Sequence, residues 1–251
     1  MPAFFIDPSN VQGEVITVSG ALLHHLRASL RSQPGDTLYL TVPGVRRYRT
    51  TVTSVDRTRL TSHIAESTDA VTPPSPQLVL AQAILKHDRM DWVIQKATEL
   101  GVESIQPLVT DQSVVRPDPK RAEAQRERWQ RISIEASQQS ERWLPSVVAG
   151  PLSLEQWMIQ WDSPGLALVL LERTHAVSLQ TVGLDTRQQT ITLLVGPEGG
   201  WREKEIDGLV KKGAVPVGMG ENILRSETAS LAAISIIQGR LGRLGTAIQS
   251  K

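Results

Sequence analysis

The chain of 251 residues contains no cysteine. Disulfides, thiolate metal sites and a cysteine nucleophile are therefore excluded. It also lacks a long hydrophobic run, because apolar stretches such as residues 165–171 fall far short of the roughly 20 residues that a membrane-spanning helix needs. The first apolar residues are soon followed by Asp7, so we expect no signal peptide. These absences predict a cytoplasmic protein with no membrane partner.

A strong excess of one charge is also missing. The chain has 27 Lys plus Arg against 26 Asp plus Glu, a net charge of +1. A protein that coats nucleic acid or membranes by bulk electrostatics would carry a large basic excess. Since 40% of the residues are hydrophobic, the composition also excludes a disordered chain. A folded protein of one large or two ordinary domains is expected.

Basic residues nevertheless gather locally. Residues 27–59 contain seven arginines and only two aspartates, a local excess of five positive charges. Within them, residues 46–49 read Arg-Arg-Tyr-Arg, which places an aromatic ring among guanidinium groups, as phosphate contact with base stacking requires. A solvated turn is the alternative for this segment. The predicted RNA-binding residues are Arg27, Arg31, Arg46, Arg47, Tyr48 and Arg49.

The pattern of predicted elements changes near residue 72. Before it, short β-branched runs at 15–18, 37–42, 49–53 and 59–64 alternate with turn signals, and residues 24–30 form a short helix. This pattern indicates a small barrel or sandwich. Three prolines within residues 73–76 then mark a linker. We therefore predict domains at 1–72 and 73–251.

After the linker, strands and helices alternate, which predicts an α/β domain with a mostly parallel sheet. The helix at 119–140 interleaves Arg with Glu, a pattern more typical of a salt-bridged outer face than of an RNA-binding surface. The last helix, 226–243, is apolar nearly all round, so it is either a core helix or part of a subunit interface. The predicted strands are 78–85, 104–109, 165–171, 190–195 and 214–218, and the other predicted helices are 88–100, 152–160 and 203–211.

Familiar catalytic motifs are absent. The sequence has no complete G-x-G-x-x-G, no Walker A loop, no G-x-S-x-G and no H-E-x-x-H. Its histidines are scattered, and the adjoining His24 and His25 would point to different faces of a helix or strand. We expect no metal site.

Two glycine-rich segments, 195–201 and 217–225, follow predicted strands. Ligands in open α/β sheets bind beyond the carboxyl ends of strands, where glycines allow a close approach of the backbone. Both segments carry carboxylates and the second carries Arg225. They predict a binding site, with two tight turns as the alternative. Ser226 as N-cap and Glu227 in the first helical turn would explain those two residues structurally.

Residues 195–201 (Val-Gly-Pro-Glu-Gly-Gly-Trp) and 223–229 (Ile-Leu-Arg-Ser-Glu-Thr-Ala) closely resemble the two signature segments of the bacterial ribosomal RNA small subunit methyltransferase E family. Residues 25–36, 86–101 and 135–145 also resemble it, in the family's order, so the resemblance covers nearly the whole chain. It implies S-adenosylmethionine-dependent methylation of uracil N3 in 16S rRNA of the small ribosomal subunit by a homodimer. It further implies a PUA-like RNA-binding β-barrel over 1–72 and a SPOUT-type methyltransferase domain with a trefoil knot over 73–251. The knot follows from the resemblance alone.

The resemblance also implies roles for particular residues. Arg225 would orient or stabilise the deprotonated uracil, with Glu198 and Glu227 as further candidates for the base or for a ligand contact. The family's pattern differs at Trp201, where Phe is usual, and at 219, 221 and 222, which puts side-chain roles of the last two in doubt. The residues implied to bind the cofactor are Leu170, Leu171, Val195, Gly196, Gly199, Gly200, Met219, Gly220, Ile223, Leu224 and Arg225. The alternatives are a non-catalytic RNA-binding or ribosome-assembly factor, and a methyltransferase of the same fold that acts on another RNA position or pyrimidine atom.

Overall fold

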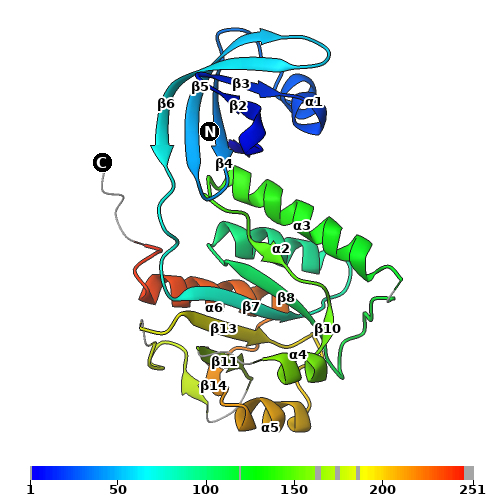
Figure 1. Ribbon diagram of the computed structural model, residues 1–251. Helices are drawn as coiled ribbons and strands as arrows, with labels where there is room; N and C mark the ends of the chain where they lie inside the picture. The colour runs from blue at the N-terminus through cyan, green and yellow to red at the C-terminus, as the bar shows by residue number, and fades with distance from the viewer. Residues whose placement is uncertain (1, 119, 162–164, 173–175, 185–186, 246–251) are drawn as a thin grey trace. The chain divides into compact units, whose positions relative to one another are not determined.

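A computed structural model describes residues 2–118, 120–161, 165–172, 176–184 and 187–245 (Figure 1). Contacts within the chain divide it into two compact units, Met1–Thr72 with Ser137–Pro145, and Pro73–Ala136 with Ser146–Lys251. The expected boundary after residue 72 coincides with a division between the units. The segment Ser137–Pro145, which we expected in the second domain, is grouped with the first.

The first unit is built on a six-stranded sheet in the order β1-β4-β5-β6-β3-β2. Its neighbouring strands are antiparallel, except that β1 and β4 are parallel. Ile16, Leu40 and Leu60 of the sheet and Leu26 of α1 form the centre of its core. Its elements are β1 (Ala3–Phe5), η1 (Pro8–Asn10), β2 (Val11–Gln12), β3 (Val15–Val18), α1 (Gly20–Ala28), β4 (Thr37–Val42), β5 (Arg46–Val55) and β6 (Leu60–Asp69).

The basic segment 46–49 lies in a strand. β5 begins at Arg46, three residues before the predicted start at residue 49, and pairs with β4 on one side and β6 on the other. The alternative interpretation of this segment as a solvated turn is therefore wrong. Strands on both sides supply hydrogen-bond partners for the backbone N–H and C=O groups of this segment. Tertiary pairing therefore decides its conformation more than its polar composition does.

The second unit is an α/β structure around an eight-stranded sheet. The strand order is β10-β8-β7-β13-β11-β14-β12, with β9 paired to β8, and the neighbouring strands of this sheet run parallel to each other. This confirms the predicted α/β fold with a mostly parallel sheet. The elements are β7 (Gln77–Ala83), α2 (Arg89–Glu99), β8 (Ser104–Val109), α3 (Ala122–Gln139), β9 (Val147–Val148), β10 (Leu152–Ser153), α4 (Leu154–Gln160), β11 (Leu166–Leu170), β12 (Val177–Ser178), β13 (Thr190–Val195), α5 (Glu203–Lys211), β14 (Val215–Gly218) and α6 (Ser226–Arg240).

Alternate residues of the central strands pack on opposite faces of the sheet, as the two-residue period of a strand requires. Ile191 and Leu193 of β13 join one core with α2 and α6, and Leu194 joins another with α4 and α5. Helices therefore cover both faces, which is why these strands are apolar at most positions, with Gln82 and Thr192 as buried polar exceptions. The two-residue strands β9, β10 and β12 are too short for such a pattern, and the sequence did not predict them.

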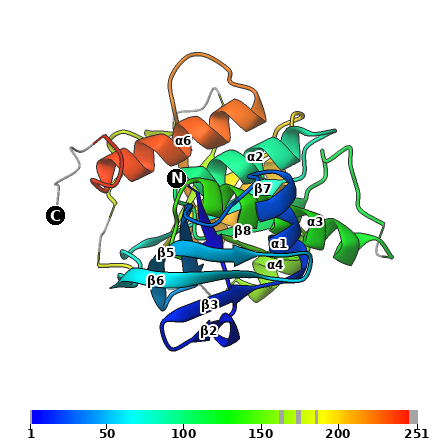
Figure 2. The same ribbon diagram turned by 90° about the horizontal axis from the view of Figure 1, so that it is seen from above.

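The last helix is a core helix. Ala229, Ala233, Ile234 and Ile237 of α6 are buried in the core that α2 shares, and Figure 2 shows the two helices side by side. The buried Gln238 amide donates to the carbonyl oxygens of Leu100 (2.8 Å) and Gly101, which fastens α6 to the end of α2. A subunit interface along its half-buried side stays a prediction. No described helix has the length and hydropathy of a membrane span.

The sheet brings three loops together. β11 lies between β13 and β14, and all three strands run parallel. The segments that follow them therefore begin at the same side of the sheet, where the strands have their carboxyl ends. The strand ends at Leu170 and Gly218 are nevertheless 48 positions apart in the sequence. This edge carries the glycine-rich segments that the sequence singled out.

Gly165 lies directly before β11, where the backbones of this segment and of Thr190 are in close contact, so a substitution there tests the packing of β11 against β13. A Cβ atom there would lie 2.2 Å from the Thr190 carbonyl oxygen, which belongs to the backbone and cannot turn away. We expect Gly165→Ala to lower the free energy of unfolding by about 1–3 kcal/mol, as overpacking does. Denaturant unfolding followed by circular dichroism measures this. Gly150→Ala, which meets no atom within 4 Å, is the matched control. Equal stability of the two variants would contradict the prediction.

Candidate functional site

A pocket of about 1030 Å³ lies where the segments after β11, β13 and β14 meet. All eleven residues that we expected to contact a cofactor line it, from Leu170 and Leu171, through Val195 to Gly200, to Met219 and Arg225. Glu172, Trp201, Glu221 and Asn222 also line it, and they were outside that set. Segments that are remote in sequence thus build one cavity of the size typical for small-molecule ligands.

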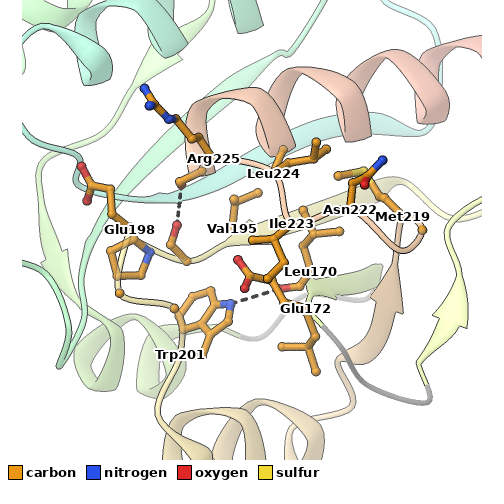
Figure 3. A pocket seen from close by; sticks show the side chains of 18 of the residues that line it. Leu170, Glu172, Val195, Glu198, Trp201, Met219, Asn222, Ile223, Leu224 and Arg225 are labelled. Carbon is orange, nitrogen blue, oxygen red and sulfur yellow. Dashed lines mark hydrogen bonds between the residues drawn. The ribbon is translucent and has the colours of Figure 1, made fainter.

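Trp201 joins two of the pocket's loops. Its indole Nε1 donates a hydrogen bond to the Leu170 carbonyl oxygen (3.2 Å; Figure 3). The ring lies against Gly196, where an added Cβ atom would be 3.0 Å from the indole nitrogen. Gly200, with φ of +72°, closes the turn by donating its N–H to the Pro197 carbonyl oxygen. The glycines at 196 and 200 are therefore explained by close packing and by a left-handed turn, respectively.

A buried hydrogen-bond network holds the β13 loop against α6. The Ser226 hydroxyl donates to the Gly196 carbonyl oxygen (2.5 Å) and accepts from Gln82 Nε2 (3.2 Å). The Ser230 hydroxyl makes hydrogen bonds with Gln82 Oε1 and with the Ser226 carbonyl oxygen. Gln82 and Ser230 are fully buried. The prediction of Ser226 as N-cap is wrong, because Arg225 occupies that position and the Ser226 side chain bonds to another loop instead.

Charged side chains gather at one end of the pocket. The Arg89 guanidinium lies 3.5 Å from Glu198 Oε1 (Nη1) and 3.7 Å from Glu227 Oε1 (Nε). Glu198 Oε1 also accepts the Lys86 N–H (3.2 Å). Glu227 does not line the pocket, and its Oε2 is buried without a hydrogen-bond partner among the described residues. Arg225 lines the pocket, and no hydrogen bond or ion pair joins it to another described residue through its side chain.

The two ends of the pocket differ in character. Figure 3 shows Glu198 and Arg225 toward one end and Met219 and Asn222 toward the other, with Leu170 and Ile223 between them. Sequence reasoning did not single out Arg89, which belongs to the first turn of α2. Its only signal was its place in the stretch 86–101, because an arginine in an amphipathic helix is otherwise unremarkable in sequence.

The segment after β8 contacts the loop that follows β13 and the start of α5. The buried Glu205 carboxylate accepts the N–H groups of Asp111 (2.9 Å) and Arg202 (2.8 Å). At the surface, the Lys204 ammonium lies 2.6 Å from Asp111. This hydrogen bond lowers the pKa of the Asp111 carboxyl and raises the pKa of Lys204. The segment also places Gln112 against Gly199, which leaves no room for a larger residue at 199 without a shift.

In the first unit, the arginines of β5 are bound within the protein. Arg46 pairs with Asp69 (2.6 Å), and Arg49 pairs with Glu66 (2.5 Å). These partners raise the pKa of both guanidinium groups. Arg47 lies 4.4 Å above the Trp143 ring and donates to the carbonyl oxygens of Glu141 and Arg142, and burial lowers its pKa.

Other predicted RNA-binding residues differ in their exposure. Tyr48 is half-buried against the core of the first unit. Arg27 and Arg31, at and just beyond the end of α1, are exposed, and no ion pair within the described part of the chain holds them. Among the described residues, no group of three His, Cys, Asp or Glu side chains could hold a metal ion.

Comparison with known proteins adds the following. Residues 73–238 match the family of RNA methyltransferase domains. The ribosomal RNA small subunit methyltransferases E of Synechocystis sp. and Bacillus subtilis are 34% and 31% identical to this chain, over 94% of it in both cases and over 77% and 96% of their own lengths. The crystal structure of the enzyme of that name from Neisseria gonorrhoeae, bound to S-adenosyl methionine, is similar with a TM-score of 0.84 and 30% identity, and covers 96% of this chain and 98% of its own.

The Ser226 hydroxyl offers a test of how the pocket is held together. Ser226→Ala leaves the Gly196 carbonyl oxygen without its partner in a buried site, so we expect a loss of about 1–3 kcal/mol in the free energy of unfolding. Urea titration followed by tryptophan fluorescence measures it. Ser235→Ala, on the same helix at a half-buried position, is the control and should change stability by less than about 0.5 kcal/mol. A Ser226→Ala variant as stable as this control would contradict the assigned role.

Proposed function

The chain belongs to the ribosomal RNA small subunit methyltransferase E family, and we propose that it methylates 16S rRNA of the small ribosomal subunit at N3 of a uridine, with S-adenosylmethionine as methyl donor. The observation that carries this proposal is the convergence of three separate loops on one pocket, which the family's two signature segments line. The function thus follows from a built site and from a likeness that extends over nearly the whole chain.

The pocket fits the cofactor. Gly196, Gly199, Gly200 and Gly220 let the backbone approach a ligand closely, and Leu170, Ile223 and Leu224 supply apolar walls. We propose that these loops hold the adenosyl and methionine parts largely through backbone groups. S-adenosylmethionine, when bound, supplies an electrophilic methyl group on a sulfonium. No metal is needed for such a transfer.

The protein must position the uracil and help its N3 proton to leave. Holding two reactants in line can contribute roughly 7–11 kcal/mol to catalysis, and a general base about 10²–10⁴-fold. We propose that Arg225 stabilises the negative charge that spreads over N3 and the flanking carbonyl oxygens as the proton leaves. Glu198, at the same end of the pocket, is our candidate for the base. Glu227 does not line the pocket, and we propose that it acts only through Arg89.

The first unit supplies the contact with RNA in this proposal, as a PUA-like barrel. Its local basic excess lies in the segment 27–59. Because carboxylates of the same unit neutralise Arg46 and Arg49, the exposed guanidinium groups of Arg27 and Arg31 are better placed to bind phosphate. Tyr48 and Arg47, both partly buried, then support the sheet.

Further features of the family are proposed on the same basis. Strand β11 precedes β13 in the chain yet lies between β13 and β14, an interleaved order that a trefoil knot in a SPOUT-type domain would require. The half-buried apolar residues Leu231 and Ile236 of α6 would suit a homodimer interface. Because the proposed substrate is ribosomal RNA, we also propose that the enzyme acts in the cytoplasm. A non-catalytic assembly factor with this fold is the alternative, and calorimetry with S-adenosylmethionine distinguishes it, because such a factor would not bind the cofactor.

Nucleoside mass spectrometry of 16S rRNA tests the function directly. A strain that lacks the gene should lose 3-methyluridine, and the wild-type gene should restore it. Arg225→Ala should not restore it, because the charge on the uracil then lacks its partner, although the protein folds and binds the cofactor. An unchanged 3-methyluridine signal in the deletion strain would rule out the proposed reaction. Restoration by Arg225→Ala would remove only Arg225 from the site.

Substitution of the exposed arginines tests the RNA-binding surface. Removal of one phosphate-binding arginine weakens binding and reduces the salt slope by about 0.7–0.9. We expect Arg27→Gln with Arg31→Gln to weaken binding to small-subunit RNA by roughly tenfold and to lower the salt slope by about 1.4–1.8. The matched control, Arg46→Gln with Arg49→Gln, removes the same charge from ion-paired positions and should have a smaller effect. Binding isotherms at several salt concentrations give the affinity and the salt slope of each variant. Equally weak binding by both double variants would contradict the assignment of Arg27 and Arg31 as the phosphate-binding residues.

A further inference from the structure

Arg89, Arg225 and Glu198 line the charged end of the pocket and Glu227 lies next to it, but these charges are not paired evenly. Arg89 contacts both Glu198 and Glu227, whereas no hydrogen bond or ion pair within the described residues holds the Arg225 side chain. Arg225 and Glu227 are only two positions apart in the chain, at the N-cap and in the first turn of α6. The arginine proposed to act on the substrate is thus the one that lacks a carboxylate partner.

From this arrangement we propose that Arg89 is a positioning residue, which keeps the Arg225 guanidinium available for the uracil by binding the carboxylates beside it. The inference rests on the proposed function, in which Arg225 is the group that faces the acceptor base. In this proposal α2 contributes to the transfer through Arg89, which supplies the positive charge that binds the carboxylates of the glycine-rich loop and of α6.

The two carboxylates depend on Arg89 to different degrees. Glu198 also accepts the Lys86 N–H, so it keeps one donor if Arg89 is removed. Glu227 has no second donor among the described residues, since its Oε2 is already buried without a hydrogen bond. Its side chain is only 13% exposed, so water can compensate little of the missing positive charge. A partly buried carboxylate without a cation is strongly unfavourable, so it either takes up a proton or pairs with another cation within reach. Arg225 is the nearest one along the chain.

The distances agree with a holding role. Contacts of 3.5 Å and 3.7 Å are longer than the roughly 2.7–2.9 Å of a tight charge-assisted hydrogen bond. Arg89 therefore balances both carboxylates electrostatically and is not locked to either. One cation between two anions leaves a residual negative charge at this end of the pocket.

Without Arg89, the Glu227 carboxylate should pair with Arg225 and keep it from the uracil. If the Glu227 carboxylate is also removed, Arg225 should be free again. We expect Arg89→Gln to lower kcat for methylation of unmodified small subunits by about tenfold or more, with the dissociation constant for S-adenosylmethionine within roughly threefold of the wild type. Arg89→Gln with Glu227→Gln should recover kcat to within roughly threefold of the wild type. Arg89→Lys, which keeps a cation beside Glu227, should lose less activity than Arg89→Gln.

Arg128→Gln is the matched control, because Arg128 also pairs with a carboxylate of α2, Asp91, but lies outside the pocket. It should leave kcat unchanged. Melting temperatures of all variants show whether each is folded.

Several results would overturn the proposal. One is full activity of Arg89→Gln. Another is a double variant as slow as Arg89→Gln, which would mean that Arg89 acts directly or only supports the fold. A loss of cofactor affinity that matches the loss of kcat would place Arg89 in the cofactor site instead. A folded Arg89→Lys variant as slow as Arg89→Gln would count against it too. If wild-type protein transfers no methyl group, the proposed function itself fails, and this inference fails with it.

Discussion

The pocket depends on buried hydrogen bonds that tie three parallel strand ends together. Glycine-rich loops can approach a ligand closely, but they lose more conformational entropy on ordering than other segments do. In this protein the order comes from side-chain hydrogen bonds, most of them from residues outside the glycine-rich loops. Gln82 of β7 and Ser230 of α6 fix Ser226, Ser226 binds the Gly196 carbonyl oxygen, and Trp201 binds the Leu170 carbonyl oxygen. These hydrogen bonds hold the loops in place around the pocket.

The sequence predicted the elements of the second unit well because both of its periodic signals are strong there. Strands covered on two faces are apolar at most positions, and the helices that cover them show an apolar stripe or, for α6, are apolar nearly all round. The glycine-rich loops were also recognisable, since glycine at the end of such a strand has few structural explanations. Gln82 and Arg89 were not recognisable. Gln82 sits in an apolar strand and meets Ser226, 144 residues later, while Arg89 meets Glu198 and Glu227. Contacts of that range leave no local pattern.

The basic segment of the first unit shows that the net charge of a surface also depends on contacts that are far apart in the sequence. Seven arginines and two aspartates in residues 27–59 give a strong local excess when charges are counted along the chain. The antiparallel pairing of β5 with β6 places Arg46 opposite Asp69 and Arg49 opposite Glu66, and both carboxylates lie beyond that segment. Cross-strand neighbours, which lie about 5 Å apart, decide the local charge more than sequence neighbours do. The free positive charge of this unit is therefore smaller than the composition indicates, and α1 carries a larger share of it.

The same reasoning links the overall charge of +1 to the proposed activity. Every phosphate that a protein neutralises adds to affinity irrespective of sequence, and a surface with many free arginines would bind RNA indiscriminately and release it slowly. In this chain carboxylates pair with several arginines, both in β5 and at the pocket, so fewer guanidinium groups are free to bind RNA than the number of arginines indicates. Such a distribution favours an enzyme that recognises one folded site by shape, holds one base in position and then dissociates. Ion pairing within the protein thus determines which arginines are left free, in the first unit and in the pocket alike.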